Sequence, residues 1–181
     1  GYTGRLIVAE ALKQGLKPLI AGRTPAAVHA LAEKYQCPAT VFTLRQKDRL
    51  AEALRTVDAV LHCAGPFTRT LDPMLSACLD TKTHYLDITG EVDVFERVFA
   101  RHKELAQTGI SAIPGVGFDV VPSDYIAVRL QQALPEAQHL QLAFRARRGG
   151  ISPGTTRTMI AHSAAGGAVR QDGQIKRVPV A

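Results

Sequence analysis

Two glycines three positions apart stand at the start of the chain, directly before a stretch with the apolar spacing of a helix. Glycines at a helix N-terminus let a phosphate group approach free backbone N–H groups, and the helix dipole favours its negative charge. This pattern predicts a site for the pyrophosphate of a dinucleotide, with an ordinary helix start after a turn as the alternative. The residues predicted to bind there are Gly1, Tyr2, Thr3 and Gly4.

An arginine stands where a dinucleotide-binding fold selects between NAD and NADP. Arg23 lies nineteen positions after Gly4, at the end of a short apolar segment, and no carboxylate follows it until Glu33. At this place an acidic residue binds the ribose hydroxyls of NAD, whereas an arginine accommodates the 2′-phosphate of NADP. The sequence therefore predicts NADP(H), with a solvated arginine at a strand end as the alternative. Gly22 and Thr24 flank Arg23 and complete this candidate cofactor contact.

A cysteine and a loop of small residues follow a continuous apolar segment. Because doubly wound sheets bind ligands beyond the carboxyl ends of their strands, this loop is a candidate cofactor contact. Ala64 and Gly65 let the backbone come close to a ligand, and Pro66 fixes the loop. Cys63 either lines the nicotinamide pocket or is a buried, inert thiol. His62 precedes it on the same strand, so the two side chains point to opposite faces and a Cys/His nucleophile pair is not expected.

Polar side chains follow the next strand segment at alternate positions, as Asp87, Thr89 and Glu91. In a parallel sheet these residues border the same crevice, which makes them candidate substrate contacts. Asp87 has two other possible roles. It could accept a hydrogen bond from the cofactor, or it could cap the helix that follows Gly90.

Three further candidate substrate contacts lie beyond the last strand segment, at Asp119, Ser123 and Thr155. Asp119 could orient a substrate or donate a proton, and a turn carboxylate explains it equally well. Ser123 also fits the first turn of a helix. Thr155 follows a small-residue loop where free helix N–H groups could hold an anionic or carbonyl group, with a plain capped loop as the alternative. No catalytic acid, base or nucleophile is singled out by the residues.

Short apolar segments that alternate with amphipathic stretches must position these side chains. The spacing predicts strands at residues 18–21, 39–44, 58–63, 84–88 and 110–113, and helices at 3–14, 25–35, 48–56, 71–79 and 92–107. Parallel strands joined by crossover helices form a right-handed, doubly wound (Rossmann) sheet, so the predicted fold class is α/β. The segment 58–63 is expected to be buried on both faces. A strand and a further glycine should precede Gly1, and a chain that lacks them is not expected to work as an enzyme by itself.

The pattern changes after residue 114, and we expect a domain boundary near residue 120. The features expected beyond it are a helix that opens at Pro122, a strand with one solvated face at 138–147, a helix at 155–165, and a hairpin at Asp172-Gly173. Residues 1–120 then form a nucleotide-binding domain, and residues 121–181 form the start of a second domain of α+β type.

The composition is that of an ordinary globular domain. Of the 181 residues, 46% are hydrophobic and 21% are charged, which excludes a disordered chain. Every apolar run is shorter than the ~18 residues of a membrane span. Three cysteines without paired spacing and six histidines without ligand spacing predict no disulfide and no metal, so a soluble, cytoplasmic protein is expected. The net charge of +6 is spread along the sequence, which disfavours a nucleic-acid partner.

Several segments together resemble the saccharopine-dehydrogenase-like oxidoreductases, a family that includes trans-acting enoyl reductases. The similar motifs, in the order of the family, are Gly1-Tyr2-Thr3-Gly4-Arg5, Ala21-Gly22-Arg23, Cys63-Ala64-Gly65-Pro66-Phe67, Tyr85-Leu86-Asp87-Ile88-Thr89-Gly90-Glu91, and Pro114-Gly115-Val116-Gly117-Phe118-Asp119 with Pro122-Ser123-Asp124. The resemblance implies an NADP-binding Rossmann domain and a second domain for substrate binding or dimerisation, whose face closes over the nicotinamide. The chain departs from the family in lacking the first strand, and the family's second domain continues beyond Ala181.

Three functions are compatible with these patterns. The leading hypothesis is an NADP(H)-dependent oxidoreductase that passes hydride to or from an enoyl or imine-like carbon of a small-molecule or lipid-like substrate, working as a monomer or a homodimer. The second is a noncatalytic NADP-binding sensor or regulator, since a nucleotide-binding fold can hold a cofactor without turnover. The third, and the least favoured, is a basic nucleic-acid binder.

Overall fold

The computed structural model describes residues 1–143, 145, 156, 166–171 and 173–179. Its chain forms two compact units, Gly1–Pro122 and Ser123–Ala181, and the division lies beside the boundary expected near residue 120. Among the helices of the described chain, none has the length and apolar character that crossing a bilayer requires.

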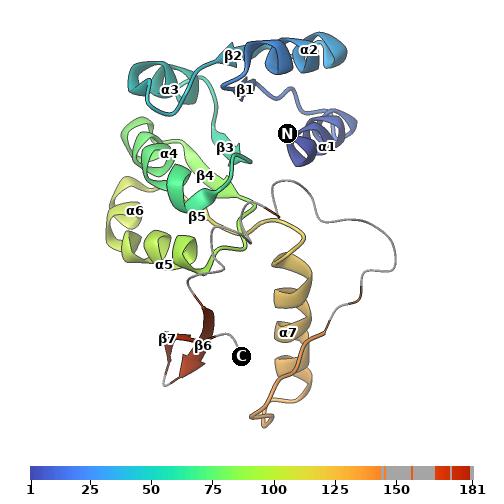
Figure 1. Ribbon diagram of the computed structural model, residues 1–181, viewed down its shortest axis with the longest axis vertical. Coiled ribbons are helices and arrows are strands. Elements are labelled where there is room, and N and C mark those ends of the chain that lie inside the picture. Colours follow the sequence, from blue (N-terminus) through green and yellow to red (C-terminus); the bar gives the residue numbers. More distant parts are fainter. Residues whose placement is uncertain (144, 146–155, 157–165, 172, 180–181) are drawn as a thin grey trace. The chain divides into compact units, whose positions relative to one another are not determined.

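The first unit alternates helices and strands along its whole length (Figure 1). In chain order its elements are α1 (Tyr2–Lys13), β1 (Ile20–Gly22), α2 (Pro25–Tyr35), β2 (Ala39–Val41), α3 (Lys47–Leu54), β3 (Ala59–His62), α4 (Phe67–Thr81), β4 (His84–Asp87), α5 (Val92–Ala100), α6 (His102–Thr108) and β5 (Ala112–Ile113). Each strand expected for this unit is present, within its predicted range except for β1, which ends one residue later at Gly22, so the alternation of predicted elements is confirmed.

The strands of the first unit form two parallel sheets. One contains β1 and β2, and the other has the order β3-β4-β5. No strand pairing joins β1 to β3 within the described residues. The doubly wound order puts one further strand between these two, and that strand stays a prediction.

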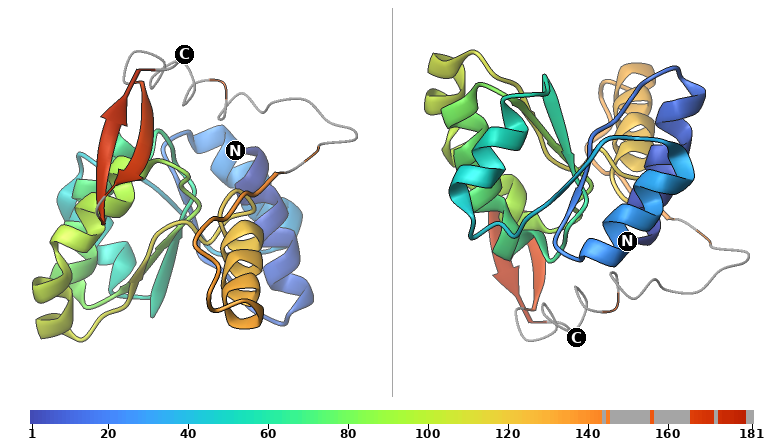
Figure 2. Two further views of the ribbon diagram at one scale, coloured as in Figure 1. Left: turned by 90° about the horizontal axis from the view of Figure 1, so that it is seen from below. Right: turned by 90° about the horizontal axis from the view of Figure 1, so that it is seen from above.

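The expectation that β3 is buried on both faces is wrong. Ala59 is exposed and Leu61 is 38% exposed, whereas His62 is buried. The reason is that β3 is an edge strand of its sheet, and helices cover only the face that carries His62. Figure 2 shows α4, α5 and α6 together on one side of the three-stranded sheet, with α1 and α2 on the other side of the unit.

Helix α4 supplies the centre of the larger core. Its apolar residues recur at intervals of three and four, which places them on one face of the helix. That face is buried against β3, β4 and the neighbouring helices α3 and α5, and its buried members are Phe67, Leu71, Met74, Leu75, Ala77, Cys78 and Leu79. A smaller core joins α1, β1 and α2 through Val8, Ile20, Val28 and Ala32.

Two local predictions in this unit need correction. The single helix expected over 92–107 is two helices, because Arg101 leaves the helical backbone (φ −92°, ψ 10°) and its guanidinium binds Glu104 at 2.8 Å and Ser76 at 3.2 Å. The helix expected over 71–79 is longer, since α4 begins at Phe67 and ends at Thr81. Thr24 is the N-cap residue of α2, and its side chain makes no capping hydrogen bond.

The second unit contains a confirmed hairpin and one wrong prediction. α7 (Val121–Ala133) begins at the junction of the units, and β6 (Gly167–Gln171) pairs antiparallel with β7 (Gln174–Val178) around the predicted two-residue turn. The strand expected at 138–147 is not formed over 138–143, where alternation lacks a pairing partner in the described chain; 144 and 146–147 lie outside the described residues. The helix expected at 155–165 also lies outside them, apart from Thr156.

Gly115 supplies a test of the packing after β5. It has φ +75°, and a Cβ atom there would lie 2.5 Å from Phe95 Cζ and 3.2 Å from Val120 Cγ2. Gly109 has nearly the same φ, +73°, with no atom within 4 Å of such a Cβ. We expect Gly109→Ala to lower the free energy of unfolding by about 1 kcal/mol, and Gly115→Ala by about 3 kcal/mol, because only the latter adds a clash to the backbone strain. Urea denaturation of both variants measures the difference, and equal losses would contradict the packing described for Phe95.

Candidate functional site

The segments that follow β3, β4 and β5 lie at one edge of a parallel sheet. They are the 63–66 loop, the 88–91 loop and the 114–119 loop, and all three belong to the first unit. Ligands of doubly wound folds bind beyond the carboxyl ends of the strands, so this edge is the candidate site.

Asp87 joins the end of β4 to the 114–119 loop. Its Oδ2 accepts a hydrogen bond from the Tyr85 hydroxyl at 2.6 Å, and its Oδ1 accepts from the backbone N–H groups of Thr89 at 2.9 Å and Gly115 at 2.8 Å. The side chain is fully buried. The helix-capping interpretation of Asp87 is wrong, because the N-cap residue of α5 is Glu91 and the carboxylate of Asp87 is bound to these other donors.

Glu91 joins the 88–91 loop to the start of α4. Its Oε1 accepts from the Phe67 N–H at 2.8 Å and its Oε2 from the Thr68 N–H at 2.9 Å, while its own N–H donates to Thr89 Oγ1 at 3.0 Å. Two N–H groups at a helix start, which have no partner within the helix, thereby receive a carboxylate, and the helix dipole favours the negative charge.

The three residues predicted on β4 and after it therefore have partners inside the chain. Asp87 and Thr89 are 0% exposed and Glu91 is 4% exposed. Direct contact with a substrate would compete with the hydrogen bonds just described. Their substrate-binding role stays a prediction, and the function that the structure gives them is to hold the strand-end loops in place.

Thr70, in the first turn of α4, fixes the 63–66 loop through hydrogen bonds. The Thr70 hydroxyl donates to the Ala64 carbonyl at 2.8 Å, with the Pro66 carbonyl at 3.3 Å as a second acceptor. Since this hydroxyl has one proton, the His62 Nε2–H, 2.9 Å away, donates to Thr70 Oγ1. Ala64 and Gly65 themselves are exposed, and the Gly65–Pro66 peptide bond is cis.

Burial governs the protonation of His62 and Cys63. It lowers the pKa of His62 from 6.5 to about 4, an effect that the negative charge of Asp87 opposes in part, so the ring is neutral near pH 7. Burial also raises the pKa of the Cys63 thiol to about 11, and Sγ donates weakly to the Leu61 carbonyl. His62 is bonded to Thr70 and Cys63 stays protonated, so the expected absence of a Cys/His nucleophile pair between them agrees with this geometry.

The start of α1 has the donors that a phosphate requires. Gly1 is its N-cap residue and Tyr2, Thr3 and Gly4 form its first turn, with no acidic side chain there and no capping side chain among the described residues. A Cβ at Gly4 would meet nothing within 4 Å, so a ligand can approach the backbone. The Gly1 nitrogen lies within electrostatic range of the Cys63 thiol, so the start of α1 is near the 63–66 loop.

Arg23 is exposed at the end of β1, directly after Gly22. A Cβ at Gly22 would lie 2.9 Å from Val28 Cγ2, so glycine permits the approach of α2. The Gly22 carbonyl accepts the Phe42 N–H at 3.0 Å, which fixes the end of β1 against β2. Neither Arg23 nor Thr24 forms an ion pair or side-chain hydrogen bond in the described chain. No such bond between described residues links the end of β1 to the three loops.

The remaining candidates are not all brought to this edge. Asp119 is exposed and lies beside Gly90, where a Cβ would be 3.8 Å from Asp119 Oδ2. Asp119 thus joins the 88–91 loop at the site. Ser123 belongs to the second unit. Thr155 lies outside the described residues.

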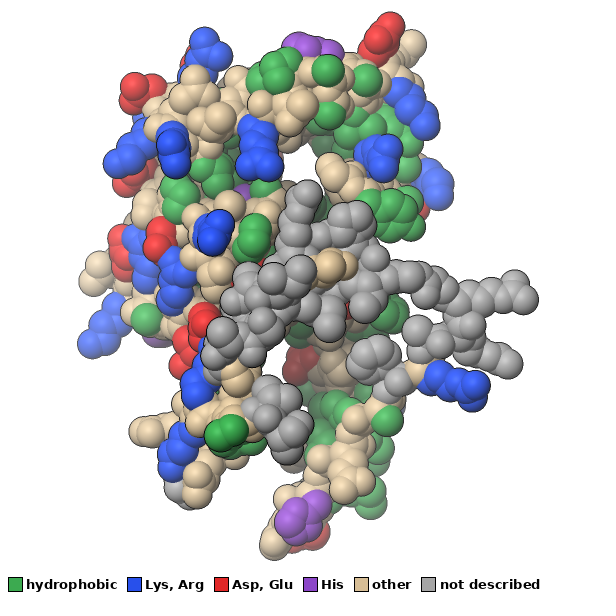
Figure 3. Space-filling view, in the orientation of Figure 1, with side chains coloured by type: hydrophobic (Ala, Val, Ile, Leu, Met, Phe, Trp, Pro, Cys, Tyr) green, Lys and Arg blue, Asp and Glu red, His purple; other side chains and the backbone are tan. Residues whose placement is uncertain are grey.

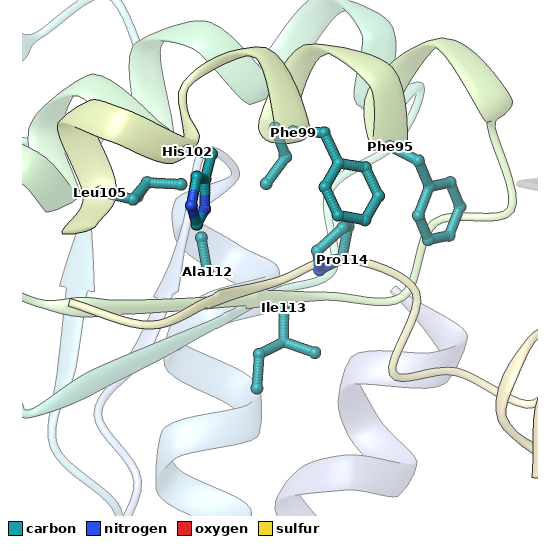
Figure 4. Close-up of a pocket in the computed structure, with 8 residues that line it drawn as sticks. Phe95, Phe99, His102, Leu105, Ala112, Ile113 and Pro114 are labelled. Carbon is teal, nitrogen blue, oxygen red and sulfur yellow. The ribbon is translucent and has the colours of Figure 1, made fainter. Parts of the chain in front are cut away.

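A shallow apolar hollow lies elsewhere, between β5 and the helices α5 and α6 (Figure 4). Its volume is about 270 Å³, and its lining consists of Phe95, Val98, Phe99, His102, Leu105, Ala112, Ile113 and Pro114. None of the predicted binding residues lines it.

No group of His, Cys, Asp and Glu side chains in the described part could hold a metal ion. On the face drawn in Figure 3, the described Lys and Arg side chains are interspersed with acidic and uncharged ones.

Comparisons with known proteins identify relatives of this chain. Residues 1–113 match the family model described as the saccharopine dehydrogenase NADP binding domain. A protein of Arabidopsis thaliana named as a mitochondrial saccharopine dehydrogenase-like oxidoreductase is 34% identical over 141 residues, which cover 68% of this chain and 31% of the relative. A protein of Mycobacterium tuberculosis named as a trans-acting enoyl reductase is 31% identical over 174 residues, which cover 88% of this chain and 41% of the relative.

The fold also matches a solved structure. Apo saccharopine dehydrogenase (L-Glu forming) from Saccharomyces cerevisiae superimposes with a TM-score of 0.65 at 20% identity, over 76% of this chain and 30% of that one. This likeness shows the Rossmann-type fold. The chain spans less than half the length of the curated relatives it matches.

The lowered pKa of His62 predicts acid sensitivity. Because the unfolded state binds a proton below about pH 6.5 and the folded state only below about pH 4, this contribution to stability is present above 6.5 and is lost as the pH falls toward 4. From about pH 7 to about pH 5, the wild type should lose about 2 kcal/mol more than His62→Gln does. Urea denaturation at both pH values measures this, with the exposed His29→Gln as the control. An unchanged pH dependence in His62→Gln would contradict the buried, neutral ring.

Proposed function

The chain belongs to the family of saccharopine dehydrogenase NADP-binding domains, and on that premise we propose that it binds NADP(H) as part of an oxidoreductase. The proposed reaction passes hydride to or from an enoyl or imine-like carbon. Relatives at 31–34% identity carry the names of a saccharopine dehydrogenase-like oxidoreductase and a trans-acting enoyl reductase, which supports this reaction class.

The observation that carries the proposal is the difference between two helix starts near one edge of the sheet. At α4, the Glu91 carboxylate already accepts hydrogen bonds from two of the N-terminal N–H groups. At α1, the N-terminal N–H groups have no capping side chain and no acidic side chain in the first turn, and a Cβ atom at Gly4 would meet nothing within 4 Å. An anionic pyrophosphate therefore fits α1 and is repelled from α4. The residues proposed to hold it are Gly1, Tyr2, Thr3 and Gly4.

Arg23 would bind the 2′-phosphate, with Gly22 and Thr24 beside it. Its guanidinium has no internal partner in the described chain, and an arginine pairs with phosphate through charge-assisted hydrogen bonds. When bound, the nicotinamide supplies the hydride chemistry. The chain's own part is to place Cys63, Ala64, Gly65 and Pro66 along the cofactor, with a protonated Cys63 thiol that does not act as a nucleophile at neutral pH.

Asp119 is the candidate for a polar contact with substrate in the first unit. It is the exposed carboxyl group of the 114–119 loop and lies beside Gly90. Its proposed role is to orient a polar group of a small-molecule or lipid-like substrate. Substrate contacts by Ser123 and Thr155, a homodimeric state and a cytoplasmic location are part of the same proposal.

A noncatalytic NADP-binding sensor is the second candidate. The observation that favours it is that Asp87, Thr89 and Glu91 use their polar groups in internal hydrogen bonds, so these three side chains are engaged in holding the loops. A screen for NADPH oxidation by the full-length protein, with enoyl thioesters and imines as substrates, separates the two. Turnover supports the oxidoreductase, whereas tight binding without turnover supports the sensor.

The choice of cofactor provides a direct test. In the full-length protein, Arg23→Ala should weaken NADPH binding by ~1.5–3 kcal/mol, the size of a charge-assisted hydrogen bond, and should change NADH binding little. Calorimetric titration with both cofactors measures this, and Arg69→Ala, an exposed arginine on α4, serves as the control. Equal losses for NADPH and NADH would refute the 2′-phosphate role of Arg23.

A further inference from the structure

We propose that Glu91 and Thr70 are positioning residues for cofactor binding, which fix the 63–66 loop from two sides so that its exposed backbone is presented in one conformation. This inference rests on the proposed function, because the ligand it concerns is NADP(H). Neither side chain needs to touch the cofactor, since each acts through the backbone that it holds.

The first hold on the loop comes from another element of the chain. Glu91 lies 24 residues beyond Phe67, and it binds the two backbone N–H groups that follow Pro66, at 2.8 Å and 2.9 Å. Both carboxylate oxygens are used, one for each N–H. The 63–66 loop can therefore not move at its exit without breaking two charge-assisted hydrogen bonds in a buried environment.

The second hold comes from within the loop's own strand and helix. Thr70 Oγ1 donates to the Ala64 carbonyl at 2.8 Å and accepts from His62 Nε2 at 2.9 Å. The His62 ring is itself wedged against Phe67, edge to face, with 5.6 Å between ring centroids. These contacts link the residue before the loop, the middle of the loop and the first turn of α4.

The two holds leave a particular surface open. The anchoring groups Glu91, His62 and Phe67 are buried, whereas Ala64 and Gly65 are exposed. The loop therefore combines a fixed backbone with small side chains, next to the start of α1. A backbone that is already ordered loses little conformational entropy when a ligand binds to it, so the same contacts give a higher affinity.

A purely structural role and a positioning role predict different results. If the two side chains only stabilise the fold, their removal lowers the thermal midpoint and leaves the affinity of the folded protein for NADPH unchanged. If they position the loop, the variants bind NADPH more weakly even at temperatures where they are fully folded, and backbone amides of residues 63–65 exchange with solvent faster in the free protein.

The variants are Glu91→Gln, which retains the shape but only one acceptor oxygen, and Thr70→Val, which removes the hydroxyl. Matched controls are Glu96→Gln, an exposed acid on α5, and Thr56→Val, which removes a similar hydroxyl-to-carbonyl bond of 2.7 Å at the end of α3. For each full-length protein, circular dichroism establishes the folded temperature range, calorimetry gives the Kd for NADPH, and hydrogen exchange reports on residues 63–65.

We expect the Kd for NADPH to rise about tenfold in Glu91→Gln and in Thr70→Val, with faster exchange at 63–65, and to stay unchanged in both controls. An unchanged Kd in the two folded variants, with only lower thermal midpoints, would overturn the positioning role. Unchanged exchange at the loop would overturn it as well, independently of any ligand. Failure of the wild-type protein to bind NADPH would instead overturn the proposed function.

Discussion

A carboxylate removed from water must be surrounded by hydrogen-bond donors, and this requirement organises the candidate site. Asp87 and Glu91 meet it with backbone N–H groups from segments distant in sequence, Gly115 for the former and Phe67 with Thr68 for the latter. Because the donors belong to the 114–119 loop and to the start of α4, satisfying the two charges also fixes these segments relative to β4. The same residues that look reactive in the sequence are thereby the framework of the strand ends.

Because of this framework, the starts of α4 and α1 differ in whether they can accept an anion. α4 begins beside an internal negative charge and is closed to anions, while α1 begins with an exposed Gly1, a half-buried Gly4 and no acid in its first turn. An incoming phosphate therefore meets one favourable helix end, near the loop that α4 and Glu91 hold in place. Selectivity for the position of the ligand follows from where the protein places its own anions, as much as from where it places its cations.

The sequence predicted the local elements well and the long-range contacts poorly. Apolar periodicity located the strands and helices of the first unit, and glycine with Asp172 located the turn of the hairpin, because these signals are local. The bond between Tyr85 and Asp87 was implicit in their spacing of two along a strand, which puts them on one face. The bonds of Glu91 to α4, and of Thr70 to Ala64, have no local signal in the sequence, so the structural roles of Glu91 and Thr70 could not be predicted from it. The face of β3 was misjudged because burial depends on neighbours that a strand's own residues do not specify.

The two parallel sheets of the first unit also have a consequence for how the protein behaves in solution. Along the sides of β1 and β3 that face away from their partners, backbone groups lack a ladder partner in the described chain. Another extended strand can form backbone hydrogen bonds along such rows, and the exposed Leu61 offers it an apolar contact. In the described chain, these two rows are therefore the places where an extended segment, from this protein or from another, can join a sheet through backbone hydrogen bonds.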